Sequence, residues 1–206
     1  MAEIILASQS PRRRHLLARM GVEFTVEPSG YDEKLDDSRS IEEVAIELSL
    51  GKARDVAAHH PQAIVIGSDT IVGIDDHQLE KPADSDEAHR MLESYAGRES
   101  VVVTGVAVIH GASSIELSGV DMTKVYFKSD TPDVARLRED YVKTGDWADK
   151  AGGYGIQNIR DTLIDHIDGD YDTVIGLPTK LLARLLSELG INAMPVEVSP
   201  NELYDD

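Results

Sequence analysis

Short apolar runs and amphipathic stretches alternate along this chain, and their spacing predicts the order of its strands and helices. Strands are predicted at residues 4–7, 22–26, 63–67, 101–109, 121–128 and 174–175. Helices are predicted from residue 11 to Gly21, over 41–58, from 84 to about 95, from 132 to near 145, and over 178–189. Because strands and helices interleave, the chain is predicted to be an α/β protein.

The length and residue content favour a single domain. The 206 residues are enough for a packed core, and residues 1–194 form one predicted domain followed by an acidic tail at 195–206.

Apolar runs stay well short of 18 residues and the N-terminus lacks a signal-peptide pattern, so we expect neither a membrane protein nor a secreted one. The sequence has no cysteine, which excludes disulfides, thiolate metal sites and a cysteine nucleophile, and suits a cytoplasmic location.

The chain is strongly acidic, with 38 acidic and 20 basic residues and a formal net charge of −18. Such a field repels phosphates, nucleic acid and anionic membranes, so a nucleotide ligand requires a local basic pocket and an extended nucleic-acid surface is not expected. Only 8 of the basic residues are lysine, and the acidic excess is spread along the chain. This pattern is typical of a halophilic protein, with an ordinary acidic cytosolic protein as the alternative.

A basic helix start near the N-terminus is the first candidate for chemistry. Ser10 and Pro11 form an N-cap followed by a proline at the first helical position, which places Arg12 to Arg14 in the first turn. The helix dipole disfavours cations there unless an anion is bound, and the free N–H groups at such a turn suit phosphate. The alternative is a solvated basic turn on a surface helix.

Gly67, Ser68, Asp69 and Thr70 follow the predicted strand at 63–67. A carboxylate at the C-terminal end of a strand lies where open α/β sheets bind ligands, and Asp69 there is suited to hold Mg²⁺ or to polarise a water. The alternative is that Asp69 only caps a turn.

Two more segments carry candidate residues. Pro82 restricts the backbone beside Lys81, so that its ammonium group is suited to point at a ligand, although a solvent-facing lysine is the commoner case. Residues 150–157 combine Lys150, three glycines and Gln157, which permits close backbone approach to a ligand and hydrogen bonds to a base edge; ordinary turns are the alternative.

Taken together, these segments resemble the Maf family of nucleoside triphosphate pyrophosphatases over nearly the whole chain. The motifs that carry the resemblance are residues 6–17, 32–34, 52–53, 69–70, 81–82, 104–106, 150–157 and 176–178. Two positions depart from the family pattern: Ser100 stands where a histidine is common, and Asn158 where a glycine is common. These departures concern local loop geometry.

The resemblance implies a mixed, twisted sheet with flanking helices, in a two-lobed architecture with a central cleft like that of inosine triphosphatases. It implies hydrolysis of dTTP, UTP and modified pyrimidine nucleotides to the monophosphate and pyrophosphate, with Mg²⁺ as cofactor and Mn²⁺ as the alternative metal. It also makes a homodimer plausible.

The resemblance further assigns roles to ten residues. Asp69, Glu33 and Lys81 are the implied catalytic residues, and Glu33 and Asp69 the implied metal ligands. Substrate binding falls to Ser8, Arg12, Arg13, Lys52 and Lys150, and nucleotide specificity to Arg12, Thr70 and Gln157. Two alternatives stay open: a purine pyrophosphatase of the inosine triphosphate type, and a non-enzymatic regulator of cell division.

Overall fold

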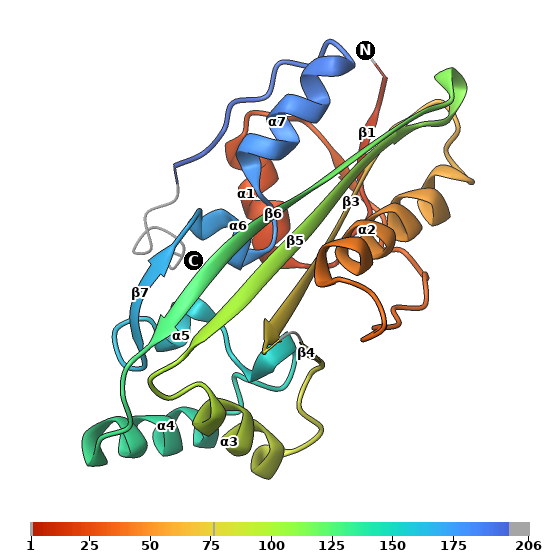
Figure 1. Cartoon of the computed structure of the whole chain (residues 1–206). Coiled ribbons are helices and arrows are strands. Elements are labelled where there is room, and N and C mark those ends of the chain that lie inside the picture. Colours follow the sequence, from red (N-terminus) through yellow and green to blue (C-terminus); the bar gives the residue numbers. More distant parts are fainter. Residues whose placement is uncertain (1, 76, 198–206) are drawn as a thin grey trace.

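A single mixed sheet of seven strands forms the centre of the computed structural model, which describes residues 2–75 and 77–197 (Figure 1). The strands are β1 (Ile4–Leu6), β2 (Thr25–Val26), β3 (Ile64–Ile74), β4 (His77–Leu79), β5 (Glu99–His110), β6 (Ile115–Phe127) and β7 (Ile164–Asp168). Their order is β2-β1-β3-β5-β6-β7, with β4 also paired to β3. The strand β1 runs parallel to β2 and β3, and the other pairings are antiparallel. The predicted α/β class with a mixed sheet is confirmed.

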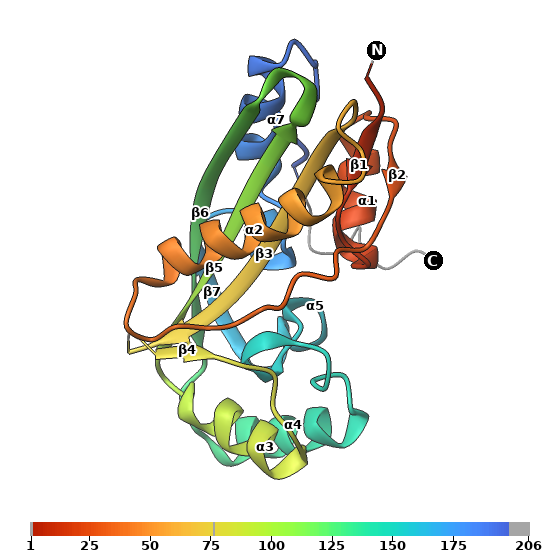
Figure 2. The ribbon, with the colours of Figure 1, turned by 90° about the vertical axis from the view of Figure 1, so that its right-hand side faces the viewer.

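The helices occupy both faces of this sheet and one of its ends. They are α1 (Pro11–Arg19), α2 (Ile41–Ala57), α3 (Ser85–Ser94), α4 (Pro132–Thr144), α5 (Ile156–Ile159), α6 (Tyr171–Ile175) and α7 (Thr179–Glu188), with short 3₁₀ turns η1 (Gly111–Ser113) and η2 (Ala151–Gly153). The long helix α2 covers one face, while α1, α6 and α7 cover the other (Figures 1 and 2). The pair α3 and α4 lies beyond one end of the sheet as a smaller second lobe (Figure 2).

Local signals in the sequence account for most helix boundaries. Ser10, Ser40, Asp84 and Thr131 each cap a helix, their side chains accepting a hydrogen bond from the backbone N–H three residues later. Helix α4 ends at Gly145, which adopts a left-handed conformation with φ 79°. These boundaries match the predicted ones because capping depends on neighbours in the sequence alone.

Four strand predictions are wrong or incomplete. The strand predicted at 121–128 begins earlier, at Ile115. The strand predicted at 63–67 continues to Ile74, because β5 pairs with β3 from Ile64 to Gly73. Residues 174–175 belong to helix α6 rather than to a strand, and the β-branched Ile175 packs into the core from that helix. The strand β2 is limited to Thr25–Val26. The strands β4 and β7 and the helix α5 were not predicted.

Two glycines allow α2 to lie directly on the sheet. A Cβ added at Gly67 or at Gly105 would overlap the backbone oxygens of Ser49 and Ala45 in α2. No larger residue fits there without moving the helix. This close contact brings the inner face of α2 down to the middle of β3.

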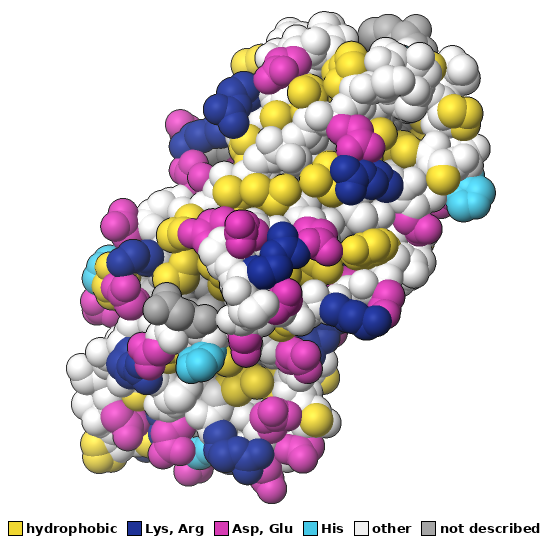
Figure 3. Space-filling view, turned by 45° about the vertical axis from the view of Figure 1, so that its right-hand side comes forward, with side chains coloured by type: hydrophobic (Ala, Val, Ile, Leu, Met, Phe, Trp, Pro, Cys, Tyr) yellow, Lys and Arg dark blue, Asp and Glu magenta, His cyan; other side chains and the backbone are white. Residues whose placement is uncertain are grey.

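The surface of the protein is charged, and the segment after α7 is fastened to the body of the fold. Acidic side chains are scattered over the face shown in Figure 3, with lysines and arginines between them. After α7, Val196 is held by hydrogen bonds to Thr179, its backbone N–H donating to Thr179 Oγ1 at 3.0 Å. The rest of the predicted acidic tail, residues 198–206, lies outside the described residues. Within the described part of the chain, no helix is both long enough and apolar enough to span a bilayer.

Candidate active site

A cleft of about 480 Å³ opens at an unpaired edge of β3. On that edge β1 pairs with residues 64–66 and β4 with residues 72–74, so residues 67–71 have no strand partner there among the described residues. On the opposite edge these residues pair with β5. Successive side chains of a strand point to opposite faces of the sheet. Asp69 and Thr70 therefore both line this opening, one from each face of the sheet.

The cleft brings together the ten residues to which the family resemblance assigns roles. Its lining includes Ser8, Arg12, Arg13, Glu33, Lys52, Asp69, Thr70, Lys81, Lys150 and Gln157. They come from the loop before α1 and the start of that helix, the loop before α2, the helix α2, the strand β3, the loop after β4, and the segment 149–157 of the smaller lobe. The cleft thus lies between the two lobes.

The centre of the cleft is a lysine shared by two carboxylates. Lys52 Nζ donates to Asp69 Oδ1 and lies 2.7 Å from Glu33 Oε1. Both Lys52 and Asp69 are buried. One ammonium between two carboxylates leaves the trio with a net negative charge, which suits a further cation. Because Asp69 lies inside β3 and bonds to Lys52, the alternative that it only caps a turn is wrong.

Glu33 lies in the loop between β2 and α2, and its charge is stabilised by its neighbours. Partial burial raises its pKa, but the hydrogen bond from Lys52 and the charges of Lys52, Lys81 and Arg13 outweigh this, so that the pKa lies below its ordinary value. Glu33 is therefore an anion at neutral pH. The loop itself is tied to α2, since Asp55 accepts hydrogen bonds from Ser29 Oγ at 2.9 Å and from the Gly30 N–H at 2.7 Å.

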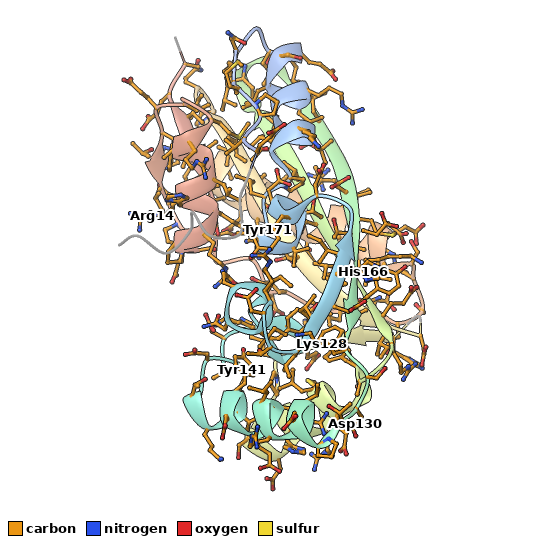
Figure 4. The ribbon with its side chains drawn as sticks, turned by 90° about the vertical axis from the view of Figure 1, so that its left-hand side faces the viewer. Arg14, Lys128, Asp130, Tyr141, His166 and Tyr171 are labelled. Carbon is orange, nitrogen blue, oxygen red and sulfur yellow. The ribbon has the colours of Figure 1, made fainter. Side chains whose placement is uncertain are left out.

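The three arginines at the start of α1 have different environments. Arg12 is half-buried and lines the cleft. Arg13 donates to the Gly176 carbonyl at 2.9 Å, to Thr70 Oγ1 at 3.1 Å and to Ser8 Oγ at 3.3 Å. Burial lowers the pKa of Arg13, yet an arginine stays charged there. Arg14 is exposed on the outer side of α1 (Figure 4). The alternative of a solvated basic turn therefore holds for Arg14 but not for Arg12 and Arg13.

Two lysines enter the cleft from the smaller lobe. Lys81 is exposed, and Lys150 is half-buried with its Nζ 2.5 Å from Asp149 Oδ1. Together with Arg12 they give the cleft a local positive charge within an acidic protein. This is the local basic pocket that an anionic ligand of this chain requires.

Two glycines of residues 150–157 make close contacts with tyrosines of the protein. Gly152 has φ 71°, and an added Cβ would come within 2.7 Å of Tyr95 Oη. Tyr95 Oη in turn donates to the Gly152 carbonyl at 2.9 Å, and the Gly155 N–H donates to Tyr141 Oη at 3.2 Å. Tyr141 reaches this segment from α4 (Figure 4). The close approach predicted for Gly152 is thus to a tyrosine of the protein.

The two departures from the family pattern have local explanations. Ser100 is fully buried, and its Oγ lies 3.0 Å from the hydroxyl of Tyr154, so it fixes a residue of the cleft wall. Asn158 donates from Nδ2 to Asp146 Oδ2 at 2.9 Å, which ties the turn to the end of α4.

Thr104 and Ser68 belong to motifs that the sequence singled out, but no role was predicted for either; they hold the cleft wall from behind. Thr104 contacts Thr70 and the Thr173 carbonyl, and Ser68 Oγ donates to the Gly176 carbonyl at 2.9 Å. A pairing of β3 with β5 predicted from their apolar runs would have placed Thr104 beside Thr70. The contacts with residues 173–176 depend on the tertiary fold.

The carboxylate pair fits a hard divalent cation. The described residues contain no group of three His, Cys, Asp or Glu side chains arranged around a metal. Glu33 and Asp69 still supply two oxygen ligands in one cleft, and Mg²⁺ is commonly held by one or two carboxylates together with substrate phosphates and waters.

The structure is that of a two-lobed α/β protein with a charged cleft between its lobes (Figure 2). The family model described as "Maf-like protein" matches residues 3–189. The chain therefore belongs to the Maf family.

Its relatives extend over nearly the same length. A protein of Pyrococcus furiosus named dTTP/UTP pyrophosphatase is 43% identical over 190 residues, which cover 92% of this chain and 96% of the relative. A protein of Deinococcus radiodurans with the same name is 43% identical, covering 94% and 96% respectively. Among solved structures, a HAM1 protein from Coxiella burnetii matches with a TM-score of 0.46 and 16% identity, over 91% of this chain and 100% of that one.

Proposed function

We propose that this protein hydrolyses dTTP and UTP between the α and β phosphates, releasing the nucleoside monophosphate and pyrophosphate. Membership of the Maf family and the two relatives named dTTP/UTP pyrophosphatase support this function. The observation that carries it is Lys52 held between Glu33 and Asp69 in a cleft whose lining also includes Arg12, Arg13, Lys81 and Lys150.

Asp69 is the proposed general base. Lys52 engages its Oδ1, so Oδ2 is the oxygen available to orient a water and take its proton as the water attacks phosphorus. The contact with Lys52 fixes the position of the Asp69 carboxylate. Glu33 and Asp69 would together hold Mg²⁺, or Mn²⁺ in its place, which when bound neutralises phosphate charge.

The remaining residues bind the substrate. Arg12, Lys81 and Lys150 would neutralise the triphosphate, Arg12 as a bidentate fork and the lysines as point charges. Lys81 would neutralise charge on the reacting phosphates and is therefore proposed as a catalytic residue. Ser8 and Arg13 would shape the phosphate site, while Arg12, Thr70 and Gln157 select the nucleotide. We further propose a cytoplasmic role in cleaning the nucleotide pool, a homodimeric state and a halophilic origin.

The proposal is tested with purified protein, Mg²⁺ or Mn²⁺, and a panel of dTTP, UTP, 5-methyl-UTP and ITP, with the products separated by ion exchange. We expect the monophosphate and pyrophosphate from the pyrimidine nucleotides. Release of orthophosphate with a diphosphate left behind would refute the reaction. Preference for ITP would instead support a purine pyrophosphatase, and the absence of hydrolysis with every nucleotide would support a regulatory role.

A further inference from the structure

A chain of hydrogen bonds runs from the cleft into the core behind Thr70. Arg13 Nη2 donates to Thr70 Oγ1 at 3.1 Å, and Thr70 Oγ1 lies 3.0 Å from Thr104 Oγ1. Thr104 Oγ1 in turn donates to the backbone carbonyl of Thr173 at 2.7 Å. Thr104 is fully buried, whereas Thr70 lines the cleft.

The direction of each bond follows from counting protons. A threonine hydroxyl has one proton and two lone pairs. The Thr173 carbonyl can only accept, so the hydroxyl of Thr104 uses its single proton to donate to it. The hydrogen bond between the two threonines must therefore be donated by Thr70. The guanidinium of Arg13 can only donate, and it occupies one lone pair of Thr70. What Thr70 offers to a ligand is therefore a single acceptor.

The face of the sheet that carries Thr70 suits a nucleobase. Thr70 pairs with Thr104 across β3 and β5, and the next pair on the same face is Val72 with Val102. The apolar lining of the cleft on this side is Val72, Val102, Tyr154, Ile156, Val174 and Ile175. Asp69 points to the opposite face, toward Lys52 on α2. The cleft thus has an apolar wall for a flat ring on the face that carries Thr70, whereas Asp69 and Lys52 lie on the other face.

We propose that Thr104 is a positioning residue that fixes Thr70 as a hydrogen-bond acceptor, so that the cleft selects pyrimidine bases with a ring N3–H. This inference rests on the proposed function. Uracil and thymine carry that donor at N3. Cytosine presents a bare, accepting nitrogen at the same ring position, and its lone pair would face the lone pair of Thr70. Two hydrogen-bond acceptors that face each other in a site without water make the binding free energy of the nucleotide less favourable, because neither has a donor.

The first test uses the wild-type protein and three nucleotides. We expect kcat/KM for N3-methyl-UTP and for CTP to be at least about tenfold below that for UTP, the loss corresponding to one hydrogen bond or more. Equal rates with UTP and N3-methyl-UTP would overturn the inference while leaving the proposed function intact. Failure to hydrolyse UTP itself would refute the proposed function.

The second test changes Thr104 alone. Thr104→Val removes the acceptor to which the Thr70 hydroxyl donates, so this hydroxyl can instead donate to cytosine N3. We therefore expect the ratio of kcat/KM for UTP to that for CTP to fall by about tenfold. Thr104→Ser keeps the hydroxyl and should keep the wild-type ratio. If Thr104→Val lowers the rates with both nucleotides equally, Thr104 has only a structural role and the inference fails. If Thr104→Val does not fold, the N3-methyl-UTP measurement decides.

Discussion

The ring of Tyr31 lies directly over Gly51 of α2, with no room for a side chain between them. A Cβ added at Gly51 would overlap atoms of the Tyr31 ring. Tyr31 belongs to the loop that carries Glu33 two residues later, and the hydrogen bonds to Asp55 hold the same loop just before it. The flat contact on Gly51 therefore helps set the position of Glu33 beside Lys52.

Gly51→Ala is expected to displace Tyr31 and with it Glu33. A small displacement of a group that binds the metal or the substrate costs on the order of tenfold to a hundredfold in kcat/KM. The melting temperature should change little, because Tyr31 is half-exposed and can move outward. Tyr31→Phe keeps the ring and serves as the matched control with near wild-type activity. Full activity in Gly51→Ala would show that the loop position does not depend on this contact.

Asp69→Asn separates the chemical role of Asp69 from its place in the strand. The asparagine preserves size and one oxygen but cannot take a proton, so turnover should fall by roughly 10²-fold or more while the circular dichroism spectrum is unchanged. Glu33→Gln should lower turnover in the same direction. A folded Asp69→Asn protein with near wild-type turnover would remove Asp69 from the mechanism.

The lowered pKa of Glu33 predicts a pH-dependent contribution to stability. In the unfolded chain Glu33 titrates near its ordinary value of 4.5, and in the folded protein it titrates lower. Its contribution is therefore present above about pH 4.5 and is lost as the pH falls through the folded pKa.

Urea unfolding of wild type and Glu33→Gln at several pH values between 3 and 7 measures this contribution. The difference in unfolding free energy between the two proteins should shrink as the pH is lowered. Glu23→Gln, at an exposed carboxylate outside the cleft, is the control for the loss of one acidic residue. A difference that stays constant over this range would contradict the lowered pKa.

Salt should stabilise the fold. With a net charge of −18, the folded chain repels itself, and molar KCl screens this repulsion. We expect the melting temperature to rise between low salt and molar KCl, with activity retained. A steady fall in melting temperature over the same range would exclude a halophilic adaptation.

Gly152→Ala should destabilise the protein more than Gly145→Ala. Both glycines have left-handed backbones, with φ 71° and 79°, and an alanine there costs about 1 kcal/mol in backbone energy. At Gly145 nothing lies within 4 Å of the added Cβ, while at Gly152 it meets Tyr95 and Val72. The excess from overpacking should be about 1–3 kcal/mol by urea unfolding. Equal losses of unfolding free energy in the two variants would mean that the turn at residues 151–153 can move to accommodate the added methyl group without strain.

The sequence predicted the start of α1 well because Ser10 and Pro11 act locally. The polar residues after Gly67, Asp69 among them, are predicted to follow the end of a strand, yet Asp69 lines the cleft from inside β3. They remain in the strand because β5 supplies a full row of backbone partners on one side. The helical state of Ile175 and the role of Thr104 also depend on contacts distant in sequence, which local patterns do not encode.

The unpaired edge of β3 has a second meaning beyond substrate binding. A free strand edge is a template on which another chain can add a strand, and long, flat, apolar edges promote aggregation. Within the part of the chain that the structure describes, the free stretch is limited to residues 67–71 and is bounded by β1 and β4. Charged side chains, Asp69 and Lys52 among them, crowd it from the side. The same charges that prepare the cleft for a nucleotide thus keep its backbone from joining the sheet of a neighbouring molecule.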